Sequence, residues 1–270
     1  MTRNFLLVSN DRRTHILKYI LLPSLYLSVI AIVSTNQNLW RTSSLDHYYI
    51  ELFGTILAGI LAFYYIYRGH TFNDKFSLFI GIGFLVNALI DLLHVTVSLL
   101  NTDNIIFLKY FIPQTWFAGR LFLSAMLLIA IFKYVSLSST SNSDIQQKQE
   151  QRQKHSNRNK EYNNQSTKLL LLYLIIVTLF SSIIAISSLF VIFPFSVIDN
   201  IPIHRPYELF PLGLLLISLY YFYKNGIYKD KDVLYVSIVI SIMVDIFGQI
   251  IMSYSANHFD TAHSIAHVLK

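Results

Sequence analysis

The 270-residue sequence lacks cysteine entirely and is poor in charge, glycine and proline. Without a thiol, the chain cannot carry a disulfide framework, a thiolate metal site or a cysteine nucleophile. Charged residues make up 13% of the chain, against the ~25% of typical soluble domains. Apolar residues reach 54%, whereas glycine contributes 9 residues and proline 6. This composition excludes a disordered chain, a collagen-like fibre and a coiled coil.

Apolar runs long enough to cross a membrane dominate the chain. About 20 apolar residues in a helix cross the ~30 Å hydrocarbon layer of a bilayer. We predict an all-α, polytopic transmembrane helical bundle, because a soluble chain of this size cannot bury so many apolar segments. No small-x-small cleavage site follows the first run, so it is not a removed signal peptide. The seven predicted spans are 16–33, 48–67, 76–100, 115–132, 169–192, 206–223 and 233–254.

The basic residues indicate the orientation of the chain in the membrane. Connections on one side, including the N-terminus, hold 16 of the 21 Lys and Arg residues, and those on the opposite side hold three. Because cytoplasmic connections carry the excess of Lys and Arg, we predict a multi-pass protein of the cell membrane with a cytoplasmic N-terminus. The net charge of +6 is thereby explained as a topology signal, and no nucleic-acid partner is needed.

Two segments fall outside the seven spans. Residues 138–167 consist almost wholly of Ser, Gln, Asn, Lys and Arg, and we predict a flexible cytoplasmic loop within a single membrane domain over 1–270. Residues 255–270 have an apolar helical pattern after a cap-like Asp260 or Thr261. We interpret this last segment as the start of an eighth span in which the chain is truncated, and a short helix lying in a groove is the alternative.

Polar and ionisable residues inside the spans gather at one depth. Burying such a group in hydrocarbon costs ~2.5–3.5 kcal/mol or more, so these residues usually mark a site. They recur at helical i, i+3 or i+4 spacing, which puts each set on one helix face. With the predicted topology, all the sets fall in the outer half of the bilayer. They are Asn87, Asp91 and His94 in the third span, Trp116 and Arg120 in the fourth, Asp245 and Gln249 in the seventh, and His263 and His267 in the last segment.

The histidines suggest a metal or haem site. His263 and His267 have the i, i+4 spacing of a ligand pair on one helix face, and His94 lies at the same depth. Imidazole is a common ligand of zinc, copper and iron. We therefore take His94, His263 and His267 as candidate metal ligands and leave open whether the cofactor is a metal ion or a haem.

Structural roles compete with these functional ones. Asp91 and Arg120 can form an ion pair that merely joins two helices, and Glu51 and Glu208 lie near the interface, where hydrated carboxylates cap helices. Together with Asp245 these acids outnumber Arg120, the one permanent cation of this outer cluster. In a low dielectric they cannot all stay ionised without protonation, an imidazolium or a bound cation.

The sequence carries none of the common enzyme motifs. Gly-x-Ser-x-Gly, His-Glu-x-x-His and Gly-rich phosphate loops are absent, and we predict no catalytic residue. The seventh span has no lysine for a retinal Schiff base. A small transporter or proton-conducting protein remains the alternative, because buried acids and histidines also build proton relays. Against it, no two spans are broken by Pro or Gly at corresponding positions of two halves.

The stretches GIGFLVNALIDLLHVTVSLL, PQTWFAGRLFLSAMLL and FDTAHSIAHVLK share three patterns with a known family. The chain resembles the third type of membrane-associated sensor domain of prokaryotic signalling proteins, which has Asp-x-x-His, Trp-x-x-x-Arg and a terminal His-x-x-Lys. It departs from that family in having VTVSLLNTD after the Asp-x-x-His, where a Tyr-x-Gly-Met-type stretch stands. The residues at the family positions are Asp91, His94, Trp116, Arg120, His267 and Lys270.

The resemblance implies a sensor fused to a histidine kinase, diguanylate cyclase or PAS module, as in two-component signalling. We therefore predict a sensory input domain with a ligand pocket in the outer half of the bilayer. A small shift of the terminal helix would carry the signal to a cytoplasmic module or partner kinase. The ligand and a homodimeric state are left open. Residues expected to bind the ligand are Asp91, His94, Trp116, Arg120, His263 and His267, with Asp245 and Gln249 below them.

Overall fold

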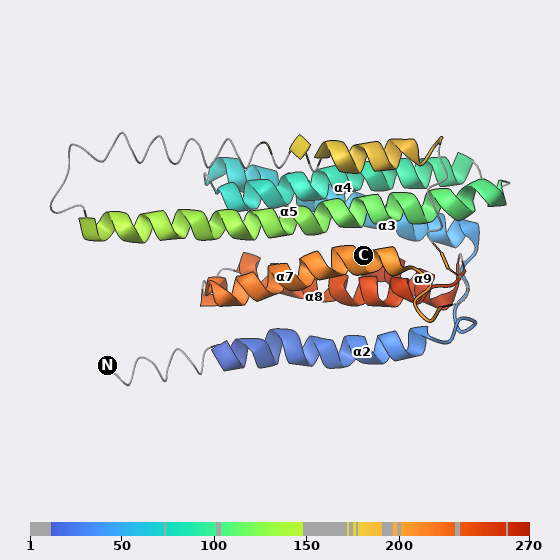
Figure 1. The fold of residues 1–270 in the computed structure, drawn as a ribbon, viewed down its shortest axis with the longest axis horizontal. Coiled ribbons are helices and arrows are strands. Elements are labelled where there is room, and N and C mark those ends of the chain that lie inside the picture. The colour runs from blue at the N-terminus through green and yellow to red at the C-terminus, as the bar shows by residue number, and fades with distance from the viewer. Residues whose placement is uncertain are drawn as a thin grey trace.

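The chain folds into a bundle of long helices that run along a common axis (Figure 1). The computed structural model describes residues 12–72, 74–100, 104–147, 172, 175–176, 178–190, 197–198, 201–229, 233–257 and 259–270. Within these ranges the chain forms helices and turns and no strand, which confirms the predicted all-α class.

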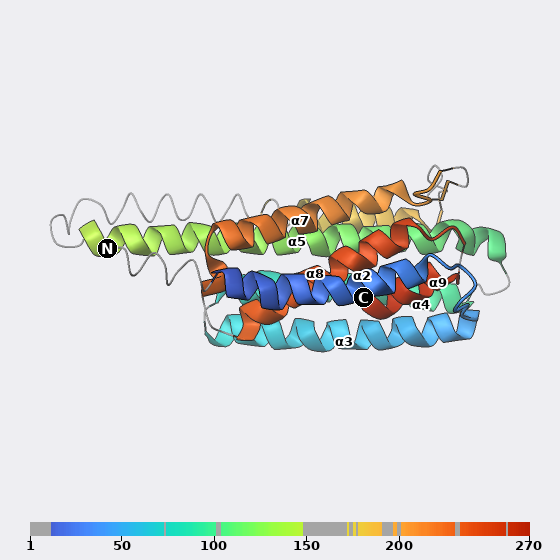
Figure 2. The ribbon, with the colours of Figure 1, turned by 90° about the horizontal axis from the view of Figure 1, so that it is seen from below.

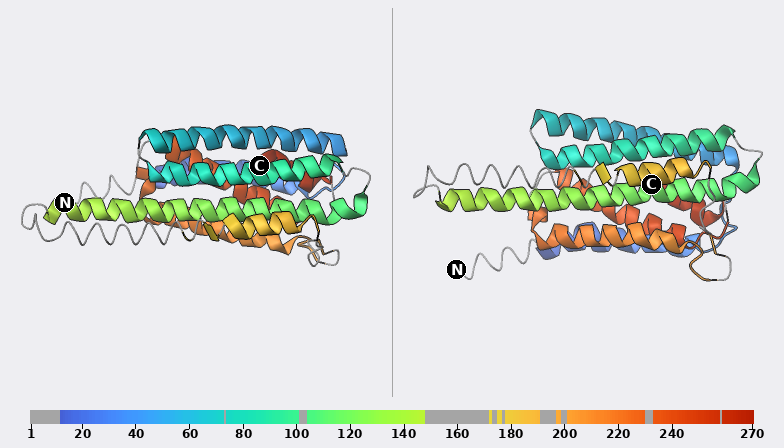
Figure 3. Two further views of the ribbon diagram at one scale, coloured as in Figure 1. Left: turned by 90° about the horizontal axis from the view of Figure 1, so that it is seen from above. Right: turned by 45° about the horizontal axis from the view of Figure 1, so that its top comes forward.

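The elements follow the predicted spans closely. In chain order they are the π-helical turn η1 (Leu17–Leu21), α2 (Leu22–Ser34), α3 (Ser44–Thr71), α4 (Lys75–Leu100), α5 (Ile105–Gln147), the 3₁₀ turn η2 (Pro206–Glu208), α7 (Leu209–Lys224), the 3₁₀ turn η3 (Ile227–Lys229), α8 (Val233–Ser253) and α9 (Thr261–Leu269). A short apolar helix over Thr178–Ser187 packs against α4 and α5 through Ala185 and Ile184 (Figure 3).

Five of the seven predicted spans coincide with helices that are long and apolar enough to cross a membrane. These helices are Arg12–Ser34, Ser44–Thr71, Lys75–Leu100, Ile106–Phe132 and Val233–Ser253. The span predicted over 206–223 corresponds to η2 and to α7, whose 16 residues fall short of that length. Of the span predicted over 169–192, the described part is helical mainly over Thr178–Ser187. The count of seven complete spans is therefore not confirmed.

Neighbours in the chain are neighbours in the bundle. Contacts run from α3 to α4, α5, α7 and α8 in turn, and α2 packs on α8. The short α9 is set inside this arrangement, against α8, α3 and α2, and the C-terminus lies part-way along the bundle (Figures 1 and 2). At one end of the bundle α2, α4 and α8 finish and α3, α5 and α9 begin. We call this the site end.

Local sequence explains where the helices of the site begin. Ser43 and Asp46 form a capping box at the start of α3, in which the Ser43 hydroxyl accepts from the Asp46 N–H at 3.1 Å and Asp46 Oδ2 accepts from the Ser43 N–H at 3.0 Å. Asp260 caps α9 by accepting from the His263 N–H at 2.8 Å. Both caps lie at the site end and fix the directions in which α3 and α9 enter the bundle.

The end of the bundle opposite the site end is held by an apolar core. Its main cluster joins side chains of α3, α4, α5, α7 and α8, including Phe76, Phe222 and Ile242. α5 continues beyond the core to Gln147, so that helix covers the first ten residues of the segment 138–167. The remainder of that segment lies outside the described residues, and its role as a flexible loop stays a prediction.

Candidate functional site

A buried cluster of charged and imidazole side chains lies near the site end, between α3, α4, α5, α8 and α9. Lys270, which follows α9, is at its centre. The Lys270 Nζ is 2.6 Å from Glu51 Oε2 on α3 and 2.7 Å from Asp91 Oδ1 on α4, and the side chain is only 4% exposed. A buried ammonium ion needs such partners to offset its lost hydration. Lys270 thus ties the end of α9 to both α3 and α4.

A second buried cation, Arg120 on α5, extends the cluster toward α8. One guanidinium nitrogen lies 3.8 Å from Asp91 Oδ2, and the other donates to Asp245 Oδ1 at 3.4 Å. Arg120 also donates to Asn87 Oδ1 at 3.3 Å, while the Asn87 amide donates to Asp91 Oδ2 at 2.8 Å. The predicted pairing of Asp91 with Arg120 is therefore present, as one part of a network across four helices.

Trp116 forms a wall of the cluster. The Arg120 guanidinium and the Lys270 Nζ lie 5.1 and 5.2 Å from the centre of its ring, within the range of cation–π attraction. The His267 ring packs on Trp116 with a centroid distance of 4.2 Å. The indole therefore contacts both cations and an imidazole of α9, so a movement of α9 must change the surroundings of Trp116.

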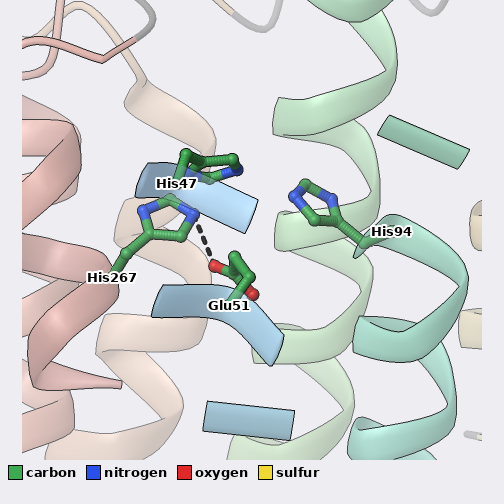
Figure 4. A group of neighbouring side chains, drawn as sticks. All are labelled: His47, Glu51, His94 and His267. Atoms are coloured by element: carbon green, nitrogen blue, oxygen red, sulfur yellow. Dashed lines mark ion pairs between the residues drawn. The ribbon is translucent and has the colours of Figure 1, made fainter. Parts of the chain in front are cut away.

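Four of the buried side chains form a set of metal-type donors. His47 and Glu51 come from α3, His94 from α4 and His267 from α9, and one donor atom of each lies within 4.8 Å of all the others. Figure 4 shows the four side chains converging on one small volume, with the His267 Nε2 at 2.8 Å from Glu51 Oε1. Three imidazoles and one carboxylate are a donor set that zinc and related ions accept.

In two of the histidines, a hydrogen bond at Nδ1 to a residue outside this set leaves Nε2 as the nitrogen that faces the other donors. The His267 Nδ1 lies 2.8 Å from the backbone carbonyl of His263, which can only accept, so Nδ1 carries the proton. The Thr115 hydroxyl donates to the Phe111 carbonyl at 2.8 Å, which leaves its oxygen to accept from His94 Nδ1 at 2.6 Å. In His94, Nε2 therefore keeps its lone pair, whereas the His267 Nε2, at 2.8 Å from Glu51 Oε1, carries a proton that it would release on binding a metal ion. Such second contacts orient metal-ligating histidines in known sites.

His47, the other cluster residue of α3, has a ring nitrogen that is not satisfied. His47 is buried, and its Nε2 has no hydrogen-bond partner among the residues that the structure describes. Its ring lies 4.7 Å from that of His267 and 5.8 Å from that of His94, measured between centroids. A buried nitrogen without a partner costs free energy, so its retention points to a ligand at this position.

The sequence that forms this site also matches a known protein family. Residues 40–270 match MASE3, described as a membrane-associated sensor domain. The chain belongs to the MASE3 family. The match covers all four donors, Lys270 and the helices that hold them, and it confirms the resemblance drawn from the three sequence patterns. No curated protein and no solved structure matches the chain significantly.

The structure brings most of the predicted ligand-binding residues of this MASE3 domain together in the buried cluster. Asp91, His94, Trp116, Arg120 and His267 all belong to the cluster, and Asp245 joins it through Arg120. That these residues bind a ligand stays a prediction, since the family match does not test it.

Three of the other residues weighed in the sequence are buried but are not among the convergent donors. His263 is buried with its ring 4.2 Å from that of His267, but it is not one of the four convergent donors. Gln249 is buried in α8, and its Oε1 has no hydrogen-bond partner among the described residues. Glu208 lies beside Trp116 and Arg205, both of which interact with its carboxylate.

Sequence reasoning missed the contribution of α3. His47 was not considered, and Glu51 was taken as an interfacial carboxylate, yet both are buried donors in the set of four. A signal was available, because His47 and Glu51 have the same i, i+4 spacing that drew attention to His263 and His267. Lys270 was recognised only as a family position, since the contacts that make it central come from helices distant in the chain.

Two cavities of the MASE3 domain are lined by residues of the cluster. One of about 140 Å³ is lined by His47 and Glu51 and extends toward Ser44 and Ser98 at the site end. The other, of about 470 Å³, is lined by Asp91, Arg120, His267 and Lys270 together with apolar residues of α3. Around these cavities, the carboxylates of Glu51, Asp91 and Asp245 face two permanent cations and the His267 imidazole, which pairs with Glu51.

Proposed function

We propose that this chain is the sensory input domain of a signalling protein, with its ligand site in the buried cluster and its output carried by α9. The site end faces the outside of the cell, in keeping with the distribution of Lys and Arg between the connections. A cytoplasmic module of the histidine kinase or diguanylate cyclase type receives the signal, as expected of a MASE3 domain.

The observation that carries this proposal is the attachment of α9 to the rest of the bundle through ligand-type groups. Lys270 and His267 bind Glu51, and Lys270 also binds Asp91. A ligand shifts a conformational equilibrium only through contacts that differ between the two states. A ligand that engages Glu51 or Asp91 competes directly with the residues that hold α9, so its binding changes the position of this helix.

A small transporter or proton-conducting protein is the competing function, and the row of buried titratable groups favours it. That row ends at Asp245, however. Beyond it, toward the opposite end of the bundle, the main core cluster consists of apolar and tyrosine side chains such as Leu123, Ile242 and Tyr235, and the buried polar groups of the described residues there are serines such as Ser218. A proton path through the described residues would need titratable groups there. Proton flux in proteoliposomes distinguishes the two functions, because a sensor should show none.

The test locks α9 with a disulfide. Thr42 Oγ1 and Ser264 Oγ are 2.9 Å apart, so the double variant Thr42→Cys/Ser264→Cys can bridge the start of α9 to the segment before α3. The chain has no cysteine that could compete. In cells, the chain is joined after Lys270 through a helical linker to a diguanylate cyclase module. Glu51→Gln, which weakens the hold on Lys270 and His267, should then change the basal output about tenfold.

Oxidation of the cysteine pair should suppress this change, and a reductant should restore it. The single variant Thr42→Cys is the matched control, since it cannot form the bridge. An output that responds to Glu51→Gln equally with and without the bridge would show that α9 does not carry the signal.

A further inference from the structure

We infer that the ligand of this sensor is a divalent transition-metal ion of the zinc type, bound by His47, Glu51, His94 and His267, and that Lys270 is the internal cation that it displaces from Glu51. The inference rests on the proposed function, whose ligand it names. Two of the donors, His47 and Glu51, were not in the set that the sequence suggested.

The separations of the four donors are compatible with a tetrahedral site after a small closure. Ligand atoms at ~2.0–2.1 Å from a zinc ion lie about 3.3–3.4 Å from one another in a tetrahedron. The donors of the set lie within 4.8 Å of each other, so they need to close by about 1.4 Å at most. His94 Nε2 and His47 Nε2, which has no hydrogen-bond partner among the described residues, provide two neutral ligands, and His267 Nε2 becomes the third when the ion displaces its proton.

The chemistry of the set favours a bare ion over a haem. The His47 ring contacts those of His94, His263 and His267 at centroid distances of 4.7–5.8 Å. This packing leaves no space for a porphyrin between the rings. Three imidazoles with one carboxylate suit zinc, copper and nickel, of which zinc accepts a tetrahedral arrangement most readily, whereas magnesium and calcium require mainly oxygen ligands.

Lys270 connects ion binding to movement. Its ammonium group holds Glu51 Oε2 at 2.6 Å, which is the carboxylate that the ion requires. A divalent ion beside Glu51 repels this ammonium strongly in a low dielectric. Lys270 then keeps Asp91, whose Oδ1 lies 2.7 Å from its Nζ, as its remaining partner. Because Lys270 follows α9 directly, the loss of the Glu51 contact shifts the end of the helix that we propose as the output.

The first test measures metal binding by the complete chain in nanodiscs after treatment with a chelator. Calorimetry with Zn²⁺ should give one ion per chain, and Co²⁺ should give the intense visible bands of tetrahedral coordination. Single variants His47→Ala, His94→Ala and His267→Ala should each weaken binding by about 100-fold or more. His70→Ala is the matched control, since His70 is an exposed residue at the other end of α3.

The second test uses a variant that should bind Zn²⁺ more tightly, a result that misfolding cannot produce. Lys270→Met keeps an unbranched side chain but removes the competing charge, so it should tighten Zn²⁺ binding on the order of tenfold or more. Binding that is unchanged or weaker in Lys270→Met would overturn the competition. Binding that depends on His263 but not on His47, or that is lacking in the wild type, would overturn the assignment of the site.

The two proposals can fail separately. If no Zn²⁺ or Co²⁺ binds, but the disulfide between positions 42 and 264 still controls the output of Glu51→Gln, the sensor proposal stands and the metal is wrong. If the ion binds as expected but the disulfide has no effect on output, the site is a structural metal site and α9 is not the output.

Discussion

Single hydrogen bonds decide whether the histidines of the cluster are ready to bind a ligand. Thr115 is the clearest case, because its hydroxyl spans the Phe111 carbonyl and the His94 Nδ1. The first contact uses the only hydroxyl proton, so the second sets the tautomer of His94. Thr115, which is not itself one of the four donors, thus determines which His94 nitrogen is available to a metal ion.

Thr115→Val is therefore predicted to weaken Zn²⁺ binding by about 10–100-fold, as loss of an outer contact does at other metal sites. Valine keeps the shape of threonine but removes the oxygen that accepts from His94. Calorimetry measures the change, and Thr115→Ser, which retains the hydroxyl, should bind nearly as the wild type does. Equal losses in both variants would mean that packing, and not the hydrogen bond, supports the site.

At the scale of elements, the position of α3 against α4 determines whether donors from these two helices meet. Gly69 and Gly81 let the two backbones approach closely. A β-carbon on Gly81 would lie 2.7 Å from the Ile66 backbone nitrogen, and one on Gly69 would lie 2.7 Å from the Leu78 nitrogen. Small residues at such contacts are typical of membrane helices, where close packing holds helices together.

Gly81→Ala should destabilise the protein by about 1–3 kcal/mol, because the added methyl group forces α3 and α4 apart. Gly59→Ala on α3 is the matched control, since nothing lies within 4 Å of its added methyl group, and it should be neutral or stabilising by about 0.5–1 kcal/mol. Thermal unfolding in detergent measures both. Equal stability of the two variants would contradict this account of the α3–α4 contact.

Much of this architecture could be predicted from hydropathy and spacing. Five of the predicted spans coincide with suitable helices, since long apolar runs determine membrane helices locally. The site was predicted where polar residues repeat along one helix, as for Asp91 and His94. Site residues were missed where their side chains meet only because helices distant in the sequence pack together. Glu51 looks like an interfacial carboxylate in the sequence, and only the position of α9 places it against His267 and Lys270.

At the scale of the whole molecule, the cluster joins two parts of the bundle. α3, α4 and α5 contribute Glu51, Asp91 and Arg120, whereas α8 and α9 contribute Asp245, His267 and the adjoining Lys270. The opposite end has an apolar core that spans α3, α4, α5, α7 and α8 but not α9. A change of charge at the cluster therefore acts on α9 against a bundle that stays fixed at its other end.

The central claim is that a ligand in the four-donor set moves α9, and Trp116 can report this movement. The chain has two tryptophans, so Trp40→Phe leaves Trp116 as the only one. Zn²⁺ does not quench tryptophan by itself, whereas His267 and Lys270 contact the Trp116 ring directly. The measurement is the Trp116 emission of this variant in nanodiscs during a Zn²⁺ titration.

The emission should change and reach a plateau at one ion per chain, and the added variant His47→Ala should abolish the change. Stoichiometric Zn²⁺ binding with unchanged Trp116 emission would contradict the account, because α9 would then stay in place when the site is filled.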